Sequence, residues 1–244
     1  MQVVILCAGR GVRMGVLTEN CPKPMLSIHE SIDGPVPILY PKLHQLRIAS
    51  LRTGIAISEI ILVVGYRREV IQNYFGDAFE GIPLRYVAQE VLDGTAGSLA
   101  LTREYITGPF MVMMGDDLYS FDDVAHMMSL PWGILAYQST DAAAFGLIET
   151  DDSGHVQRII ERPHGHATGL VNTGVYMLQP SYFDLPIVAI SETEYGLPQT
   201  LMQLVGRVAI PLVITTHWHP IGKPEDLAGA YEFVLRTNPD ENIS

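Results

Sequence analysis

Apolar residues are grouped in two ways along the first half of the chain. Short, β-branched runs predict strands at residues 3–7, 60–64, 84–88 and 110–114. Between them, apolar residues recur with helical spacing, which predicts helices at residues 38–46, 68–75 and 95–106. Strands and helices that alternate in this way are typical of βαβ units. We therefore expect an α/β fold with a doubly wound, mostly parallel, Rossmann-like sheet.

The pattern changes after Trp132. Short apolar segments separated by turn residues predict β-hairpins added to the sheet, with strands at residues 134–138, 146–149, 156–160 and 171–178. A helix is predicted at residues 224–236, because Pro224 begins it and acidic residues follow in its first turn. Residues 238–244 are expected to fray. The chain has no internal repeat, so we expect a single domain over residues 1–244.

Composition narrows the classes of function. The 244 residues are 48% hydrophobic, which is enough for one large core. The net charge of −12 opposes binding to nucleic acid or to anionic membranes. No apolar run approaches the ~20 residues of a membrane span, and no basic leader precedes the first strand, so a cytoplasmic protein is expected. Cys7 and Cys21 lack the spacing of a metal site or a disulfide framework.

A loop that contains two glycines follows the first predicted strand. Ligands of open α/β sheets bind at the carboxyl ends of the strands. Gly9 and Gly11 would let backbone N–H groups approach a phosphate, and Arg13 adds a fixed positive charge. The loop is neither a Walker motif nor a dinucleotide fingerprint, because no Gly-Lys-Ser/Thr follows and Met14 stands where the fingerprint needs glycine. A tight turn between a strand and a helix would contain the same glycines.

Two further segments hold charged residues on a restricted backbone. Lys23 lies between Pro22 and Pro24, which keep the chain extended and fix the position of the lysine. Asp116 directly follows the apolar strand and Gly115, so its carboxylate is a candidate oxygen ligand for Mg²⁺. The alternatives are a solvated lysine and an aspartate that only stabilises a turn at the strand end.

Together these segments resemble the sugar-nucleotide pyrophosphorylases, a family that includes thymidylyl-, uridylyl- and guanylyltransferases of sugar 1-phosphates. The resemblance extends over nearly the whole chain. It implies a glycosyltransferase-A-like nucleotidyltransferase fold, with a nucleotide-binding half at residues 1–130 and a sugar-phosphate-binding half at residues 131–237. The matching segments are Gly9-Arg10-Gly11-Val12-Arg13, Leu17-Thr18, Pro22-Lys23-Pro24, Gln89 with Gly94-Thr95-Ala96, Gly115-Asp116, Phe145-Gly146, Glu161-Arg162-Pro163, Asn172-Thr173-Gly174 and Gly222-Lys223-Pro224-Glu225-Asp226-Leu227.

The resemblance implies that a nucleoside triphosphate and a sugar 1-phosphate form a nucleoside diphosphate sugar and pyrophosphate. The catalytic residues would be Arg13, Lys23 and Asp116, of which Asp116 would hold Mg²⁺. The nucleotide would be bound by Ala8, Gly9, Gly11, Arg13, Gln89, Gly94 and Thr95. The sugar phosphate would be bound by Gly146, Glu161, Arg162 and Asn172.

Some of these candidates have structural alternatives. Glu161 would be an exposed ion-pair partner if Arg158 or Arg162 held it, and Asn172 would stabilise a turn. The side-chain amide of Gln89 can pair with a carbonyl and an imide N–H on one base edge, so we expect UTP or dTTP rather than GTP or ATP. A glutamine can also face a purine edge or lie in solvent.

The chain departs from the family pattern in places. Val12 interrupts the glycine motif, and Pro220 stands two residues after Trp218, where relatives commonly have an aspartate as a second metal ligand. Asp117 could partly substitute for it; Asp226 could also reach the metal, although an aspartate in a first helical turn more simply interacts with the helix dipole. The chain lacks the left-handed β-helix repeats that some relatives append, so no second activity is expected.

Other functions stay open. Cytidylyltransferases or guanylyltransferases of other phosphate acceptors share the N-terminal motif, although a choline acceptor would call for an aromatic cage. Because Pro220 replaces a metal ligand, the chain could also be a regulator that binds a nucleotide or sugar phosphate without turnover. We do not expect zinc, because the paired histidines lack an obvious third ligand. The expected partners are small-molecule substrates, with no nucleic acid and no membrane, and a homo-oligomer is left open.

Overall fold

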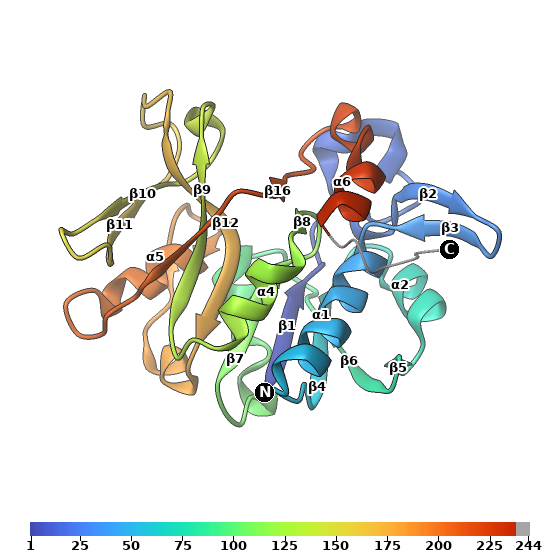
Figure 1. Ribbon diagram of the computed structural model, residues 1–244, viewed down its shortest axis with the longest axis horizontal. Helices are drawn as coiled ribbons and strands as arrows, with labels where there is room; N and C mark the ends of the chain where they lie inside the picture. The colour runs from blue at the N-terminus through green and yellow to red at the C-terminus, as the bar shows by residue number, and fades with distance from the viewer. Residues whose placement is uncertain (238–244) are drawn as a thin grey trace.

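Parallel strands form the centre of the molecule in a computed structural model, which describes residues 1–237 (Figure 1). They are β1 (Gln2–Leu6), β4 (Glu59–Val64), β6 (Ile82–Ala88) and β7 (Phe110–Met114). β1 pairs with β4 on one side and with β7 on the other, and β6 pairs with β4. This arrangement confirms the predicted doubly wound, mostly parallel sheet. The predicted frayed tail, residues 238–244, lies outside the described residues.

Helices cover both faces of the parallel strands. Alternate residues point to opposite faces, so Val3 and Ile5 enter one core and Val4 enters another. The first core is covered by α1 (Leu39–Thr53), α2 (Arg68–Phe75) and α4 (Phe121–Met128). The second is covered by α3 (Gly94–Ala100) and α5 (Leu197–Leu201). Because both faces of these parallel strands are buried, nearly every strand residue is apolar, and the sequence shows continuous apolar runs.

The second half of the chain extends the same sheet, as predicted, with strands that pair mostly antiparallel. β12 (Gly169–Leu178) pairs antiparallel with β7 and so joins the two halves. The other added strands are β9 (Gly133–Ser139), β10 (Leu147–Thr150), β11 (Val156–Ile160) and β15 (Leu212–Thr215). Of these, β15 pairs with β9 in parallel. With β5 (Ala78–Phe79) at the far edge, ten strands form one sheet within the described residues.

Small elements complete the structure around the ends of the parallel strands. They are β2 (Ser27–Ser31) with β3 (Gly34–Pro37), β8 (Leu118–Tyr119) with β16 (Trp218–His219), and β13 (Val188–Ala189) with β14 (Tyr195–Gly196). In Figure 1 the chain crosses from the second half to the first through β16, and α6 (Ala230–Thr237) is the last described element. A small third core joins Met14, Leu118, Ile221 and Phe233. It holds the glycine loop, β8 and α6 together.

Two predicted helices are shorter or divided in the structure, and the one predicted at residues 38–46 continues to Thr53. The helix predicted at residues 95–106 ends at Ala100, because the hydroxyl and the N–H of Thr102 both donate to the carbonyl of Leu99. The helix predicted at residues 224–236 is divided: a 3₁₀ turn spans Pro224–Leu227, and Gly229, with a φ of 81°, separates it from α6. No helix within residues 1–237 is long and apolar enough to cross a bilayer.

Candidate active site

The carboxyl ends of β1, β6 and β7 open onto a cavity of about 480 Å³, the nucleotide cavity. Every residue predicted to bind the nucleotide lines it. A second cavity of about 400 Å³, the acceptor cavity, is lined by all the residues predicted to bind the sugar phosphate. Arg13, Lys23 and Asp116 line both cavities. The predicted catalytic residues therefore lie where the two cavities meet.

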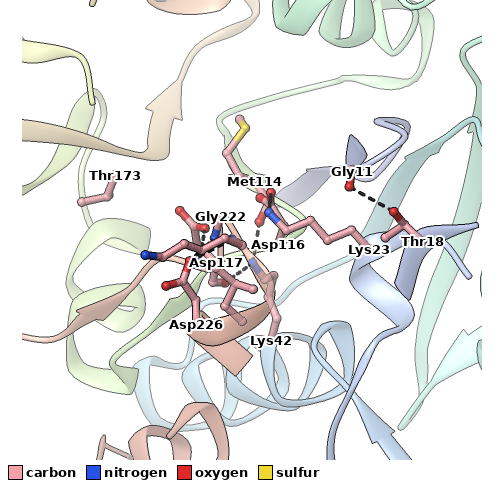
Figure 2. Close-up of polar contacts among 12 residues, drawn as sticks. Gly11, Thr18, Lys23, Lys42, Met114, Asp116, Asp117, Thr173, Gly222 and Asp226 are labelled. Atoms are coloured by element: carbon pink, nitrogen blue, oxygen red, sulfur yellow. Dashed lines mark hydrogen bonds and ion pairs between the residues drawn. The ribbon is translucent and has the colours of Figure 1, made fainter. Parts of the chain in front are cut away.

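The glycine loop is held by residues on either side of Arg13. Gly11 has a φ of 62°, and a Cβ there would lie 2.9 Å from the Cβ of Lys23, so the position requires glycine. Its carbonyl accepts hydrogen bonds from the N–H of Met14 at 2.9 Å and from the hydroxyl of Thr18 at 3.0 Å (Figure 2). Arg13 is exposed, and no carboxylate within residues 1–237 pairs with it. Its guanidinium is therefore available to an anion.

Lys23 and Asp116 form an ion pair at the boundary between the cavities. The side chain of Lys23 is 7% exposed, which excludes the solvated lysine that was the alternative from the sequence. Its Nζ donates to Oδ2 of Asp116 at 2.5 Å (Figure 2). The Asp116 side chain is 35% exposed and reaches the cavities. In the free protein, the cation and the carboxylate neutralise each other.

The turn before Asp116 depends on close backbone approach. The N–H of Gly115 donates to the carbonyl of Leu6 at 2.9 Å, which continues the pairing of β7 with β1. A Cβ on Gly115 would lie 2.6 Å from Sγ of Cys7 and 2.8 Å from the oxygen of Leu6. Only glycine fits there without movement of the backbone. Asp116 is thus presented from a rigid strand end.

Asp117 links that strand end to the C-terminal segment. Its Oδ2 accepts from the indole N–H of Trp218 at 3.2 Å, and its Oδ1 accepts from the backbone N–H of Ile221 at 3.1 Å. Burial and the neighbouring Asp116 raise the pKa of Asp117 to about 7. Because both oxygens have backbone or indole donors, Asp117 acts here as a cross-link rather than as a free metal ligand.

A buried lysine that we did not predict lies beneath the same turn. Lys42 of α1 is 1% exposed, and its Nζ donates to the carbonyl of Asp117 at 2.6 Å and to that of Met114 (Figure 2). Burial lowers the pKa of Lys42 to about 8, against the opposing effect of Asp117. The sequence held a signal for it: Lys42 lies four residues after Ile38 and three after Leu39, on the apolar face of the helix.

The predicted base-recognition segment rests on the hairpin of β13 and β14. Gln89 is buried, so it does not lie in solvent, and its Nε2 donates to Oδ1 of Asp93 at 2.8 Å and to the carbonyl of Gly94 at 3.3 Å. Thr95 accepts at Oγ1 from the N–H of Leu197 at 3.0 Å. Ile190 of the connecting loop lines both cavities, a long-range contact that no local sequence pattern signals.

Side-chain pairs line the acceptor cavity. Glu161 accepts at Oε1 from Gln199, at 2.9 Å, and not from Arg158 or Arg162. The amide nitrogen of Asn172 donates to the hydroxyl of Tyr176 at 2.6 Å, and its oxygen accepts from the N–H of Gly174 at 3.1 Å. Asn172 therefore has the turn-stabilising role and lines the cavity as well.

Arg162 and Gln199 complete the polar lining of this cavity. The guanidinium of Arg162 donates to the carbonyl of Ala144 at 2.8 Å. Gln199 was missed from the sequence, because it reaches Glu161 from a different element, α5. A contact between residues 38 positions apart has no local pattern that would signal it.

Comparison with known proteins decides the family. The model of the nucleotidyl transferase family matches residues 2–237. The chain belongs to this family. It is 30% identical over 237 residues to the UTP–glucose-1-phosphate uridylyltransferase AglF of Haloferax volcanii, covering 93% of each chain. It is 29% identical over 242 residues to the bifunctional protein GlmU of Methanococcus aeolicus, covering 97% of this chain and 55% of that protein.

The solved structures agree in fold. A Bacillus anthracis protein in complex with sucrose superposes with a TM-score of 0.81 at 19% identity, covering 100% of this chain and 97% of the other. At this identity the likeness concerns the fold alone. The chain spans about half the length of the GlmU protein that it matches.

For this nucleotidyl transferase family member, the donor set at the shared boundary limits how a metal can bind. Within residues 1–237, no group of three or more His, Cys, Asp or Glu side chains could hold a metal ion. Pro220 lines the acceptor cavity but offers no side-chain ligand. Asp226 accepts at Oδ2 from the N–H groups of Gly222 (2.7 Å) and Lys223 (2.9 Å), so it caps the start of the 3₁₀ turn in which it lies. Asp116 is therefore the carboxylate at this boundary that could hold a metal, if phosphate and water supplied the other ligands.

Proposed function

We propose that this protein transfers a nucleotidyl group from a nucleoside triphosphate to a sugar 1-phosphate and releases pyrophosphate. The observation that carries the proposal is the shared boundary of the two cavities, where Arg13, Lys23 and Asp116 line both. A reaction between two phosphorylated substrates needs cationic and metal-binding groups at the point where the substrates meet. The names of AglF and of other relatives, which specify sugar 1-phosphate substrates, support the same acceptor class.

The chemistry is an in-line displacement. An oxygen of the sugar 1-phosphate forms a bond to the α-phosphorus, the bond from that phosphorus to the bridging oxygen breaks, and the electron pair leaves with pyrophosphate. No covalent nucleophile from the protein is needed. Gly9 and Gly11 offer backbone N–H groups and Arg13 a bidentate cation to the β- and γ-phosphates. Lys23, released from Asp116, neutralises charge on the α-phosphate.

Asp116 is the residue that would hold Mg²⁺, completed by phosphate oxygens and water. When bound, the metal would supply charge neutralisation and a template for the triphosphate. Because Lys23 occupies Asp116 in the free protein, we expect metal and nucleotide to bind together.

The base remains a prediction. With its amide nitrogen occupied by Asp93 and Gly94, Gln89 retains its carbonyl oxygen as an acceptor for an imide N–H. Uracil and thymine carry such a group, so UTP and dTTP are still expected. Guanine also carries an N–H next to a carbonyl, and GTP is therefore the informative competitor.

The polar lining of the acceptor cavity favours a sugar over choline. Glu161, Asn172 and Gln199 offer donors and acceptors for hydroxyl groups. Trp218 is buried and makes an edge contact with Phe145, with ring centroids 4.8 Å apart, so it packs in a core rather than in an open cage. The cytoplasmic location and the question of a homo-oligomer stay predictions.

The test is pyrophosphate release over a grid of triphosphates and sugar 1-phosphates with Mg²⁺. We expect turnover with UTP or dTTP and at least one sugar 1-phosphate. Best turnover with GTP would contradict the base assignment alone. Measurable nucleotide binding without turnover in any pair would favour the alternative that Pro220 raises, a regulator that binds these ligands without reaction.

A further inference from the structure

Lys42 is a charged residue placed where charge is costly. It lies in α1, is 1% exposed, and its Nζ lies 4.9 Å from the centroid of the Tyr119 ring. Burial of an ammonium group is unfavourable unless hydrogen bonds replace its hydration. The replacements here are main-chain carbonyls, those of Met114 and Asp117. Lys42 lines neither cavity, so it cannot contact the substrates directly.

The two carbonyls stand on either side of Asp116. Met114 is the last residue of β7, and Asp117 immediately precedes β8. One ammonium group therefore joins the two ends of the turn 114–117 from below (Figure 2). From the other side, the turn is tied to β1 by the bond from Gly115 to Leu6.

We infer that Lys42 is a positioning residue that fixes the turn 114–117 and so presents the Asp116 carboxylate to Lys23 and to the metal–nucleotide complex. The inference rests on the proposed function of Asp116. A metal-binding carboxylate must be held within a fraction of an ångström to act on transition-state charge. In the proposed site, Asp116 is the one protein carboxylate. No second protein ligand would hold the metal in place if Asp116 were misoriented.

Gln45 provides a matched control. It lies three residues further along the same helix, is also buried, and donates from Nε2 to the carbonyl of Tyr119 at 2.6 Å. It thus supports the same stretch of chain from the same helix, beyond the turn that holds Asp116. Removal of the Lys42 or the Gln45 side chain leaves buried carbonyls without a hydrogen-bond donor. Substitution of either residue is therefore expected to lower stability.

The first measurement is amide hydrogen exchange by NMR in the free protein, in Lys42→Met and in Gln45→Met. We expect the Gly115 amide to exchange at least tenfold faster, relative to the amides of β4, in Lys42→Met and to change less than threefold in Gln45→Met. Equal acceleration in both variants, or none in Lys42→Met, overturns the inference. If Lys42→Met does not fold, Lys42→Gln is measured in its place with the same expectations.

The second measurement is binding of Mn²⁺ with UTP, detected by electron paramagnetic resonance, in a double-mutant cycle with Asp116→Ala. We expect Lys42→Met to weaken binding at least fivefold with Asp116 present and less than twofold with Asp116→Ala. Equal weakening in both backgrounds shows a general structural role and overturns the inference. A wild type that binds no Mn²⁺–UTP contradicts the proposed function, and amide exchange then decides on Lys42 by itself.

Discussion

The shared boundary of the two cavities and the rest of the acceptor cavity are built in different ways. At the shared boundary, Asp116 extends from a parallel strand end that neighbouring backbone holds by hydrogen bonds, and the buried Lys42 supports it. In the acceptor cavity, the side chain of Gln199 orients Glu161, and Asn172 is held by the Tyr176 hydroxyl together with the N–H of Gly174. At the boundary, main-chain hydrogen bonds fix the strand end that carries the charged Asp116. In the acceptor cavity, hydrogen-bonding groups depend largely on contacts with other side chains. We therefore expect the first to tolerate little change and the second to be adjustable.

The largest effect is expected from the ion pair between the cavities. Lys23→Met and Asp116→Asn should each lower kcat/KM by at least ~100-fold, because in the proposed mechanism both groups act on charge that develops in the transition state. Steady-state rates of pyrophosphate release measure this. Arg103→Met removes an exposed ion pair with Asp184, 3.2 Å long and outside both cavities, and serves as the control. A variant of Lys23 or Asp116 with wild-type kcat/KM would remove that residue from the catalytic set.

Glycine substitutions test the contrast in rigidity. Gly115→Ala should lower the free energy of unfolding by about 1–3 kcal/mol, because its Cβ would overlap Cys7 and Leu6. Gly146→Ala, in the acceptor cavity, should cost less, since its Cβ would lie 3.3 Å from Ile159 and 3.4 Å from Glu161. Gly108→Ala meets no atom within 4 Å and is the control. Urea denaturation measures all three, and an equal loss for Gly115 and Gly146 would contradict the contrast.

The same contrast explains how much the sequence could predict. The strand at residues 110–114 and the helix at 68–75 have the predicted bounds, because local apolar periodicity determines them. Lys23 and Asp116 were assigned from separate motifs, and the structure brings them together at 2.5 Å. Their roles in the reaction stay predictions. Motifs at strand ends are predictable because parallel strands bring them to one edge of the sheet.

Other features depend on contacts between distant segments. Lys42 was visible only as a charged residue on an apolar helix face, and its partners are 72 and 75 residues away. Gln199 and Ile190 reach the cavities from elements whose placement no local pattern determines. The continuous helix predicted at residues 224–236 is wrong, because Gly229 adopts a positive φ that helical spacing does not reveal.

A smaller effect is expected from the side-chain pair of the acceptor cavity. Gln199→Ala removes the donor that orients Glu161, so the KM for the sugar 1-phosphate should rise by about tenfold, with the KM for the triphosphate nearly unchanged. Gln203→Ala is the control, because Gln203 follows on the same segment and donates to Pro186 and Thr200, outside both cavities. Equal changes in both KM values would show that the two cavities are not independent.

The smallest effect is expected at Pro220, where a carboxylate can be added to the acceptor side of the boundary. Pro220→Asp should tighten the apparent Mg²⁺ affinity by about fivefold, since one unit charge at ~4 Å in a solvated site contributes about 1 kcal/mol. Asp226→Ala should leave the Mg²⁺ dependence nearly unchanged and lower stability, because Asp226 accepts from the N–H groups of Gly222 and Lys223.

Mg²⁺ titrations of pyrophosphate release in wild type and in both variants measure these changes. A tight Mg²⁺ dependence in wild type that disappears in Asp226→Ala would show that Asp226, and not solvent or phosphate oxygen, supplies the missing ligand. The boundary would then hold its metal from both segments, Asp116 at the end of β7 and Asp226 beyond β16, and the assignment of charge to the strand end alone would be wrong.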